Sequence, residues 1–90
     1  MQIVELIKSF CNENSDKYRV YEKYSGKYMF GKTCLGVVIK KDYSYMDFLA
    51  KLTTYLQEHD YDDADFYLEG IAVDELGLDT IVYFPRIECK

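Results

Sequence analysis

One segment of the chain has the letters of a phosphate-binding loop. Residues 26–33 are GKYMFGKT and match the pattern GxxxxGK[ST], in which backbone amides and the lysine hold nucleotide phosphates. That chemistry needs a helix after the loop, because the amides of the helix N-terminus point at the anion. Here residues 34–39, CLGVVI, indicate a strand instead, and Tyr28, Met29 and Phe30 are bulky for a phosphate cradle. We therefore interpret the match as a coincidence.

An acidic segment near residue 60 is a candidate for calcium, because clustered carboxylates suit that ion. A calcium loop needs oxygen ligands at positions one, three and five, a glycine at six and a glutamate at twelve. Counted from Asp60, position five is Ala64, position six is Asp65 and position twelve is Ile71. The pattern fails three times, so we predict no metal site. Two interpretations stay open: a solvated loop, or a loop that presents negative charge to a basic groove on a partner.

The chain lacks the groups that hydrolytic sites combine. His59 is the only histidine, and no serine or cysteine has a visible base partner, so a catalytic triad is not expected. The cysteines, Cys11, Cys34 and Cys89, form an odd set without CxxC spacing, which is typical of reduced thiols in a cytosol and gives no zinc pattern. We expect no enzymatic activity, no cofactor and a cytoplasmic location.

Size and composition predict a single domain over residues 1–90. The chain is 49% hydrophobic and 17% aromatic, which allows one modest core. No apolar run approaches the ~20 residues that a spanning helix needs, and the first ten residues lack the pattern of a signal peptide. We expect no membrane partner.

Charge is divided unevenly along the chain, which has a net charge of −5 at pH 7. Residues 1–45 hold eight Lys/Arg against five Asp/Glu, whereas residues 46–90 hold three against eleven. A negative chain is repelled by nucleic-acid phosphates, so direct nucleic-acid binding is not the favoured function. The weakest alternative is a nucleic-acid-binding ribbon with aromatic stacking, for which the lysines would be Lys17, Lys23, Lys27 and Lys32.

Hydrophobic periodicity predicts two amphipathic helices. The first runs from Gln2 to about Asn14, with an apolar stripe of Ile3, Leu6, Ile7, Phe10 and Cys11. The second begins after Ser44, which with Asp47 resembles a capping arrangement, and it ends near His59. Its stripe is Tyr45, Phe48, Leu49, Leu52, Tyr55 and Leu56, with His59 as a further candidate.

Alternating apolar residues and turn signals predict about five strands. They cover residues 17–24, 27–30, 34–39, 66–73 and 80–84. The first two form a hairpin with Tyr18, Val20 and Tyr24 on one face, and the third is apolar enough to be central. Gly70 marks a bulge, residues 74–77 form a loop, and the central part of the last strand stops before Pro85. The order αβββαββ predicts an α+β domain, with a mainly antiparallel sheet of about five strands and two helices packed on one face.

These features favour a small acidic, non-catalytic binding protein that inhibits a partner with a basic surface, such as a nuclease or another nucleic-acid enzyme. Close charges steer encounter, and tyrosines supply desolvated contact. The expected partner-binding residues are Asp60, Tyr61, Asp62, Asp63, Asp65, Tyr67, Glu69, Asp74 and Glu75. In size, acidity and lack of catalytic groups the chain is similar to small phage-encoded anti-defence proteins, including anti-CRISPR proteins, and to toxin-neutralising immunity proteins. This resemblance covers length and composition, and it implies no role for any particular residue.

The alternative is a structural or assembly role. An exposed edge strand pairs readily with its own copy, so the chain could form a homodimer or larger homo-oligomer through strand edges or through the tyrosine-bearing segment 18–28.

Overall fold

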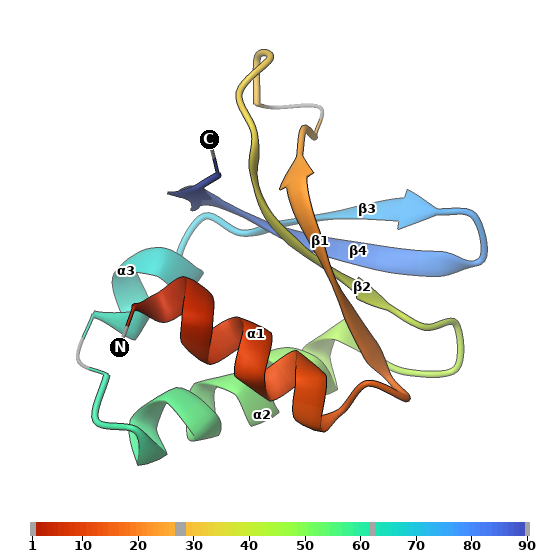
Figure 1. The fold of residues 1–90 in the computed structure, drawn as a ribbon. Helices are drawn as coiled ribbons and strands as arrows, with labels where there is room; N and C mark the ends of the chain where they lie inside the picture. The colour runs from red at the N-terminus through yellow and green to blue at the C-terminus, as the bar shows by residue number, and fades with distance from the viewer. Residues whose placement is uncertain (1, 27–28, 62, 90) are drawn as a thin grey trace.

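The computed structural model describes residues 2–26, 29–61 and 63–89 and shows an α+β fold with a four-stranded antiparallel sheet (Figure 1). The elements in chain order are α1 (Ile3–Glu13), β1 (Tyr18–Tyr24), β2 (Cys34–Ile39), α2 (Tyr45–Glu58), α3 (Ala64–Leu68), β3 (Ala72–Leu76) and β4 (Asp79–Glu88). The strand order is β1-β2-β4-β3, so β1 and β3 form the edges. The described residues form three helices where two were expected, and the helices lie on one side of the sheet (Figure 1). No helix in the described ranges is long and apolar enough to cross a membrane.

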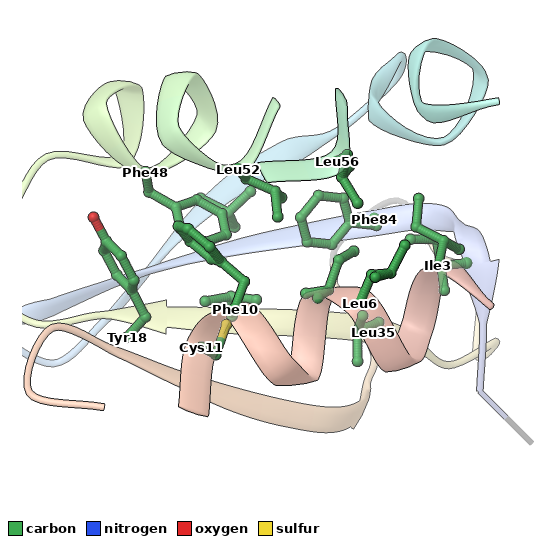
Figure 2. Packing of buried hydrophobic residues seen from close by; sticks show 14 of the residues in the cluster. Ile3, Leu6, Phe10, Cys11, Tyr18, Leu35, Phe48, Leu52, Leu56 and Phe84 are labelled. Carbon is green, nitrogen blue, oxygen red and sulfur yellow. The ribbon is translucent and has the colours of Figure 1, made fainter. Parts of the chain in front are cut away.

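The main core lies between the helices and one face of the sheet (Figure 2). The predicted stripe of α1 is buried in full, and it packs with Phe48, Leu52 and Leu56 of α2. Side chains alternate between the two faces of a strand, and Leu35 and Val37 of β2 join this core. All six residues of β2 are buried, because the strand is central in the sheet and covered on both faces. The prediction of a buried central strand is confirmed.

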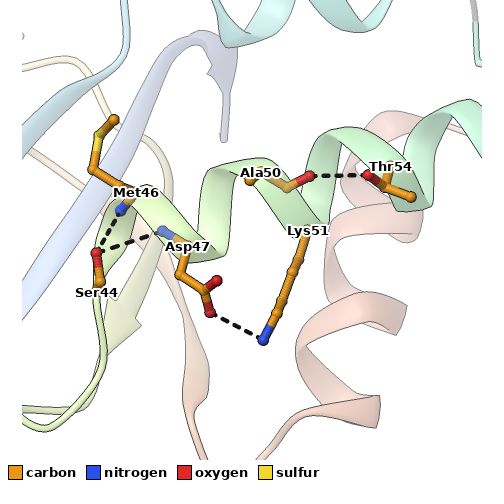
Figure 3. Close-up of polar contacts among 6 residues, drawn as sticks. All are labelled: Ser44, Met46, Asp47, Ala50, Lys51 and Thr54. Atoms are coloured by element: carbon orange, nitrogen blue, oxygen red, sulfur yellow. Dashed lines mark hydrogen bonds and ion pairs between the residues drawn. The ribbon is translucent and has the colours of Figure 1, made fainter.

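Helix α2 begins at the predicted cap. The Ser44 hydroxyl accepts hydrogen bonds from the amides of Met46 and Asp47, at 3.1 and 3.5 Å, and Asp47 forms an ion pair with Lys51 at 3.0 Å (Figure 3). The helix runs through Glu58. Tyr45, expected on the buried stripe, is instead 38% exposed, because it lies in the first turn beside an exposed loop.

Met29 and Phe30, the described part of the strand predicted over residues 27–30, do not pair with β1. Residues 27 and 28 lie outside the described residues, and Met29 and Phe30 belong to turns closed by Met29 N–H to Gly26 O and Lys32 N–H to Met29 O. Phe30 and Gly31 have positive φ angles of 52° and 84°, which a regular strand does not contain. Strand β1 pairs with β2 instead, so residues 25–33 form one long connection.

The end of β1 changes phase at Lys23. Its φ of 56° coincides with a shift in register between β1 and β2, as expected for a β-bulge. Tyr18 and Val20 therefore face the helices, whereas Tyr24 packs in a second cluster on the other face. The expectation that these three side chains share a face is wrong.

A helix and a shorter strand replace the strand predicted over residues 66–73. Ala64 is buried and Leu68 half-buried at a spacing of four, which places both on one face of α3. Gly70, with a φ of 78°, lies in the connection to β3 rather than at a bulge. The loop predicted over residues 74–77 is also wrong, because β3 runs through Leu76 and only Gly77 and Leu78 form the turn. Gly77 has a φ of 65°, which a two-residue hairpin with glycine first requires.

Strand β4 runs to Glu88, beyond the predicted end at residue 84, but its regular pairing with β2 stops before Pro85, as predicted. Phe84 pairs with Leu35, and the next pair along β2 joins Cys34 to Glu88. The three residues between Phe84 and Glu88 therefore form an irregularity in the ladder, which accommodates a proline that cannot donate a hydrogen bond.

The sheet face away from the helices carries a second, smaller cluster. Met29, Cys34 and Tyr83 are buried there, and Tyr24 and Ala72 pack against them. The connection between β1 and β2 approaches this face closely, because a Cβ built on Gly26 would lie 2.5 Å from Cζ of Tyr83. A side chain at position 26 would overlap the ring.

Candidate binding surface

The structure divides the expected binding residues between two places. The acidic corner, which we define as the connection between α2 and α3 together with α3 and Glu69, contains Asp60, Tyr61, Asp63, Asp65, Tyr67 and Glu69. Asp74 and Glu75 lie on the edge strand β3. Asp62 lies outside the described residues.

The backbone of the acidic corner is fixed by the end of α2. His59 is the C-cap, and its Nδ1 lies 2.8 Å from the Tyr55 carbonyl, while its ring packs on that of Tyr55 at 4.2 Å between centroids. Asp60 takes a left-handed conformation with a φ of 55°, and the Tyr61 N–H donates to the Leu56 carbonyl at 3.1 Å. These bonds turn the chain sharply before α3. The histidine serves to end a helix in this structure.

Three carboxylates of the acidic corner are exposed and unpaired. Asp60, Asp63 and Asp65 point to solvent, and within the described ranges none of them forms an ion pair or a side-chain hydrogen bond. Asp63 occupies the N-cap position of α3 without capping it through its side chain. The three charges are therefore available to an external cation.

Glu69 differs from these residues because Arg86 of β4 compensates its charge. The guanidinium lies 3.2 Å from the Glu69 carboxylate and donates a hydrogen bond of 2.9 Å to the Phe66 carbonyl. It also lies over the Phe66 ring, 4.7 Å from the centroid. Arg86 thus connects α3 to the end of strand β4 in the sheet.

Aromatic rings lie next to the carboxylates. Phe66 is 55% exposed and contacts Tyr67 edge to face at 5.1 Å, and Tyr67 lies 6.4 Å from Tyr61. Partial burial raises the pKa of Tyr61, and the neighbouring Tyr67 and Asp63 act in the same direction. Phe66 and Arg86 were missed in the sequence. Helical spacing was the available signal, since Ala64 and Leu68 take the buried side of α3 and leave Phe66 outside.

The two acidic residues of β3 are in different environments. Asp74 lies on the face away from the helices and accepts a hydrogen bond of 2.8 Å from the Tyr24 hydroxyl. Burial, followed by this bond, raises the pKa of Tyr24 to about 12. Glu75 is exposed, and its side chain has no bonding partner in the described part of the chain.

The segment with the phosphate-loop letters runs directly into β2 rather than into a helix. The Thr33 hydroxyl donates to the Cys89 carbonyl, so that threonine ties the segment to the end of β4. Among the described residues no group of three His, Cys, Asp or Glu side chains is placed to hold a metal ion. Cys11 is buried, and burial raises its pKa to about 12. That thiol is protonated at neutral pH.

Comparisons of the chain with protein-family models, with curated proteins and with solved structures find no match. The chemistry open to the acidic corner is electrostatic. Unpaired carboxylates attract cationic side chains, and an exposed ring beside them can cover part of the contact from water.

Proposed function

We propose that the protein is a small acidic binding protein that inhibits a partner with a basic surface, of the class that includes nucleases and other nucleic-acid enzymes. One observation carries the proposal: Asp60, Asp63 and Asp65 are exposed without ion-pair partners in the described part of the chain, next to the exposed ring of Phe66. A surface that attracts cations and also offers apolar contact suits a protein partner.

Such a partner would use lysines and arginines placed for phosphate groups. Carboxylates at the acidic corner would occupy those cations and compete with the nucleic acid, as closely placed negative charges can. Complementary charge also raises the rate of encounter, and salt screens it. Phe66 supplies an apolar contact, and aromatic residues of this kind are enriched at protein interfaces.

The remaining acidic residues are secondary in this proposal. Glu69 and Asp74 already have partners within the chain, Arg86 and Tyr24. Breaking these contacts would offset part of any gain from binding a new cation. We expect Asp60, Asp63 and Asp65 to contribute most.

The test uses the intact chain and a triple variant, D60N/D63N/D65N. Asparagine tolerates the left-handed conformation of residue 60, and Asp63 makes no side-chain cap that the change could remove. The fold is therefore expected to persist, which circular dichroism checks. A matched control, E5Q/D16N/D42N, removes three negative charges at exposed positions outside the acidic corner.

Both variants and the native chain serve as bait in lysate of the cells that express the chain, at low and high salt, followed by mass spectrometry. Any captured basic protein is then purified, and its activity on nucleic acid is measured with each bait added. We expect the native chain and the control to bind and inhibit at low salt, and the corner variant to lose both effects by at least about tenfold. Equal binding by the native chain and the corner variant would refute the proposal.

A further inference from the structure

A groove of about 670 Å³ runs between α1 and the free edge of β1. Lys8 and Asn12 of α1 line one wall, and Tyr18, Arg19 and Val20 of β1 line the other. Strand β1 is at the edge of the sheet, so one side of its backbone has no neighbouring strand. An unpaired edge beside a groove can receive an additional strand.

The pairing pattern shows which backbone groups face this groove. Lys40 N–H donates to the Lys17 carbonyl at 3.0 Å, and residues of an antiparallel strand alternate in the direction of their hydrogen-bonding groups. Arg19 and Tyr21 therefore direct theirs toward β2, whereas Val20 directs its groups away from it, and the regular alternation ends after Tyr21, where the register shifts. The groove thus offers the amide and carbonyl of Val20, whereas the Tyr18 amide already donates to the Asn14 carbonyl.

The opposite edge of the sheet, β3, is complementary to this groove. The same alternation can be followed from β1 through β2 and β4 to β3. It shows that the backbone groups of Val73 and Glu75 point away from β4, toward the free edge of the sheet. Val73 is 39% exposed, although it is apolar. Asp74 and Glu75 give this edge negative charge.

We propose that β3 of one copy of the chain pairs with β1 of a second copy, in this groove, so that the sheet continues head to tail. Neighbouring strands in the order β1-β2-β4-β3 are antiparallel, so β3 runs opposite to β1. When the protomer is repeated in the same orientation, β3 of one copy therefore lies antiparallel to β1 of the next. The helices of both copies then lie on the same side of the sheet. This interface does not involve the acidic corner.

The register of the sheet specifies the contacts. Arg19, Val38, Ile81 and Asp74 lie in one row across the four strands. Repeating the protomer along that row sets Arg19 of one copy opposite Asp74 of the next, in a pair without mutual backbone hydrogen bonds, where side chains are closest. In the adjacent row, Val20 meets Val73 in a hydrogen-bonded pair.

Charge selects this arrangement over a two-fold dimer. Two β1 edges would bring Arg19 and its basic neighbours together, and two β3 edges would bring acidic residues together. Like charges on paired strands are unfavourable, whereas opposite charges are favourable. Arg19 forms no ion pair with any described residue of its own chain, so it is free to meet Asp74 of another copy. A head-to-tail contact that does not close gives an open series rather than a dimer.

The test is sedimentation equilibrium between about 10 μM and 1 mM, because opposite charges on paired strands favour association and like charges oppose it. We expect the mass of the native chain to rise with concentration past that of a dimer. R19E and D74K should each weaken association at least about tenfold, because each sets like charges against each other. An equimolar mixture of R19E and D74K should associate again, because both of its contacts join opposite charges.

A control isolates the loss of the Tyr24 hydrogen bond from the change in charge. Y24F removes that bond while keeping Asp74, and it should associate like the native chain. Native protein that stays monomeric throughout the range would overturn the proposal. An R19E variant that associates like the native chain would also overturn it. This measurement tests the proposal even if D74K fails to fold. The corner variant D60N/D63N/D65N should associate normally, which separates this interface from the proposed function.

Discussion

Replacing Gly26 by alanine tests how the connection between β1 and β2 rests on the sheet. The added Cβ would lie 2.5 Å from Cζ and 2.7 Å from Cε2 of Tyr83. Ordinary carbon contacts are about 3.5–4.0 Å, so the ring or the connection must move by about 1 Å. Tyr83 is fully buried, and its ring packs against that of Tyr24 at 5.1 Å. We expect the connection to lift from the sheet.

The size of the effect follows from two opposing terms. Overpacking a well-filled site costs about 1–3 kcal/mol. Alanine also restricts the unfolded chain relative to glycine, which raises the free energy of unfolding by about 0.4–1 kcal/mol. With the middle of each range, the net loss in the free energy of unfolding is about 1.3 kcal/mol, which for a domain of this size lowers Tm by about 5–10 °C.

Urea denaturation followed by circular dichroism measures this loss, with Ser25→Ala as the neighbouring control, because Ser25 is exposed. Tyr83→Leu in the Gly26→Ala background should cost less than it does in the native chain, since the smaller side chain relieves the overlap. If Gly26→Ala leaves stability unchanged and the two substitutions are additive, the connection does not lie against Tyr83 in solution.

Three further changes test other parts of the molecule. The buried Tyr18 hydroxyl has no hydrogen-bond partner in the part of the chain that the structure describes, so Tyr18→Phe should raise the free energy of unfolding by about 1 kcal/mol; a loss of stability in urea would show that the hydroxyl is bonded. Ser44→Ala removes the cap of α2 and should lower the free energy of unfolding by about 1 kcal/mol. An unchanged Tm would argue against the cap. Because burial and the Asp74 bond raise the pKa of Tyr24 from 10.0 to about 12, its contribution to stability is complete below pH 10 and lost as the pH rises toward 12. Denaturation at pH 9 and pH 11.5 should therefore show a smaller fall for Tyr24→Phe than for the native chain, and equal falls would exclude this contribution.

The elements that were predicted correctly are those specified by residues close together in the chain. The stripe of α1, the cap at Ser44 and the apolar run of β2 each follow from neighbouring residues, and the structure contains all three. The α+β class follows from their order. The number of strands does not follow from it, because Met29 and Phe30 fit a strand as well as a turn.

The second half of the chain shows why short apolar segments are ambiguous. Residues 66–73 contain enough β-branched and aromatic residues for a strand, yet Ala64 and Leu68 bury one side of a helical turn against the core. Tertiary packing decides between these forms, and it is not visible in a window of a few residues.

The candidate surface was predictable in composition but not in electrostatics. The carboxylates near residue 60 are evident from the sequence. The Arg86 contact with Glu69 and the Tyr24 bond to Asp74 join residues far apart in the chain, so no spacing rule identifies them. These contacts decide which acidic residues remain free.

The strand order has a consequence for how fast the chain folds. Strands β1 and β2 are joined by residues 25–33, and β3 and β4 by only two residues, whereas β2 and β4 are separated by residues 40–78. Contacts between distant segments carry a larger entropic cost of loop closure and slow folding. We expect the two hairpins to form first and the seam between β2 and β4 to close last, so that truncating Val37 or Val82 speeds unfolding more than it slows folding.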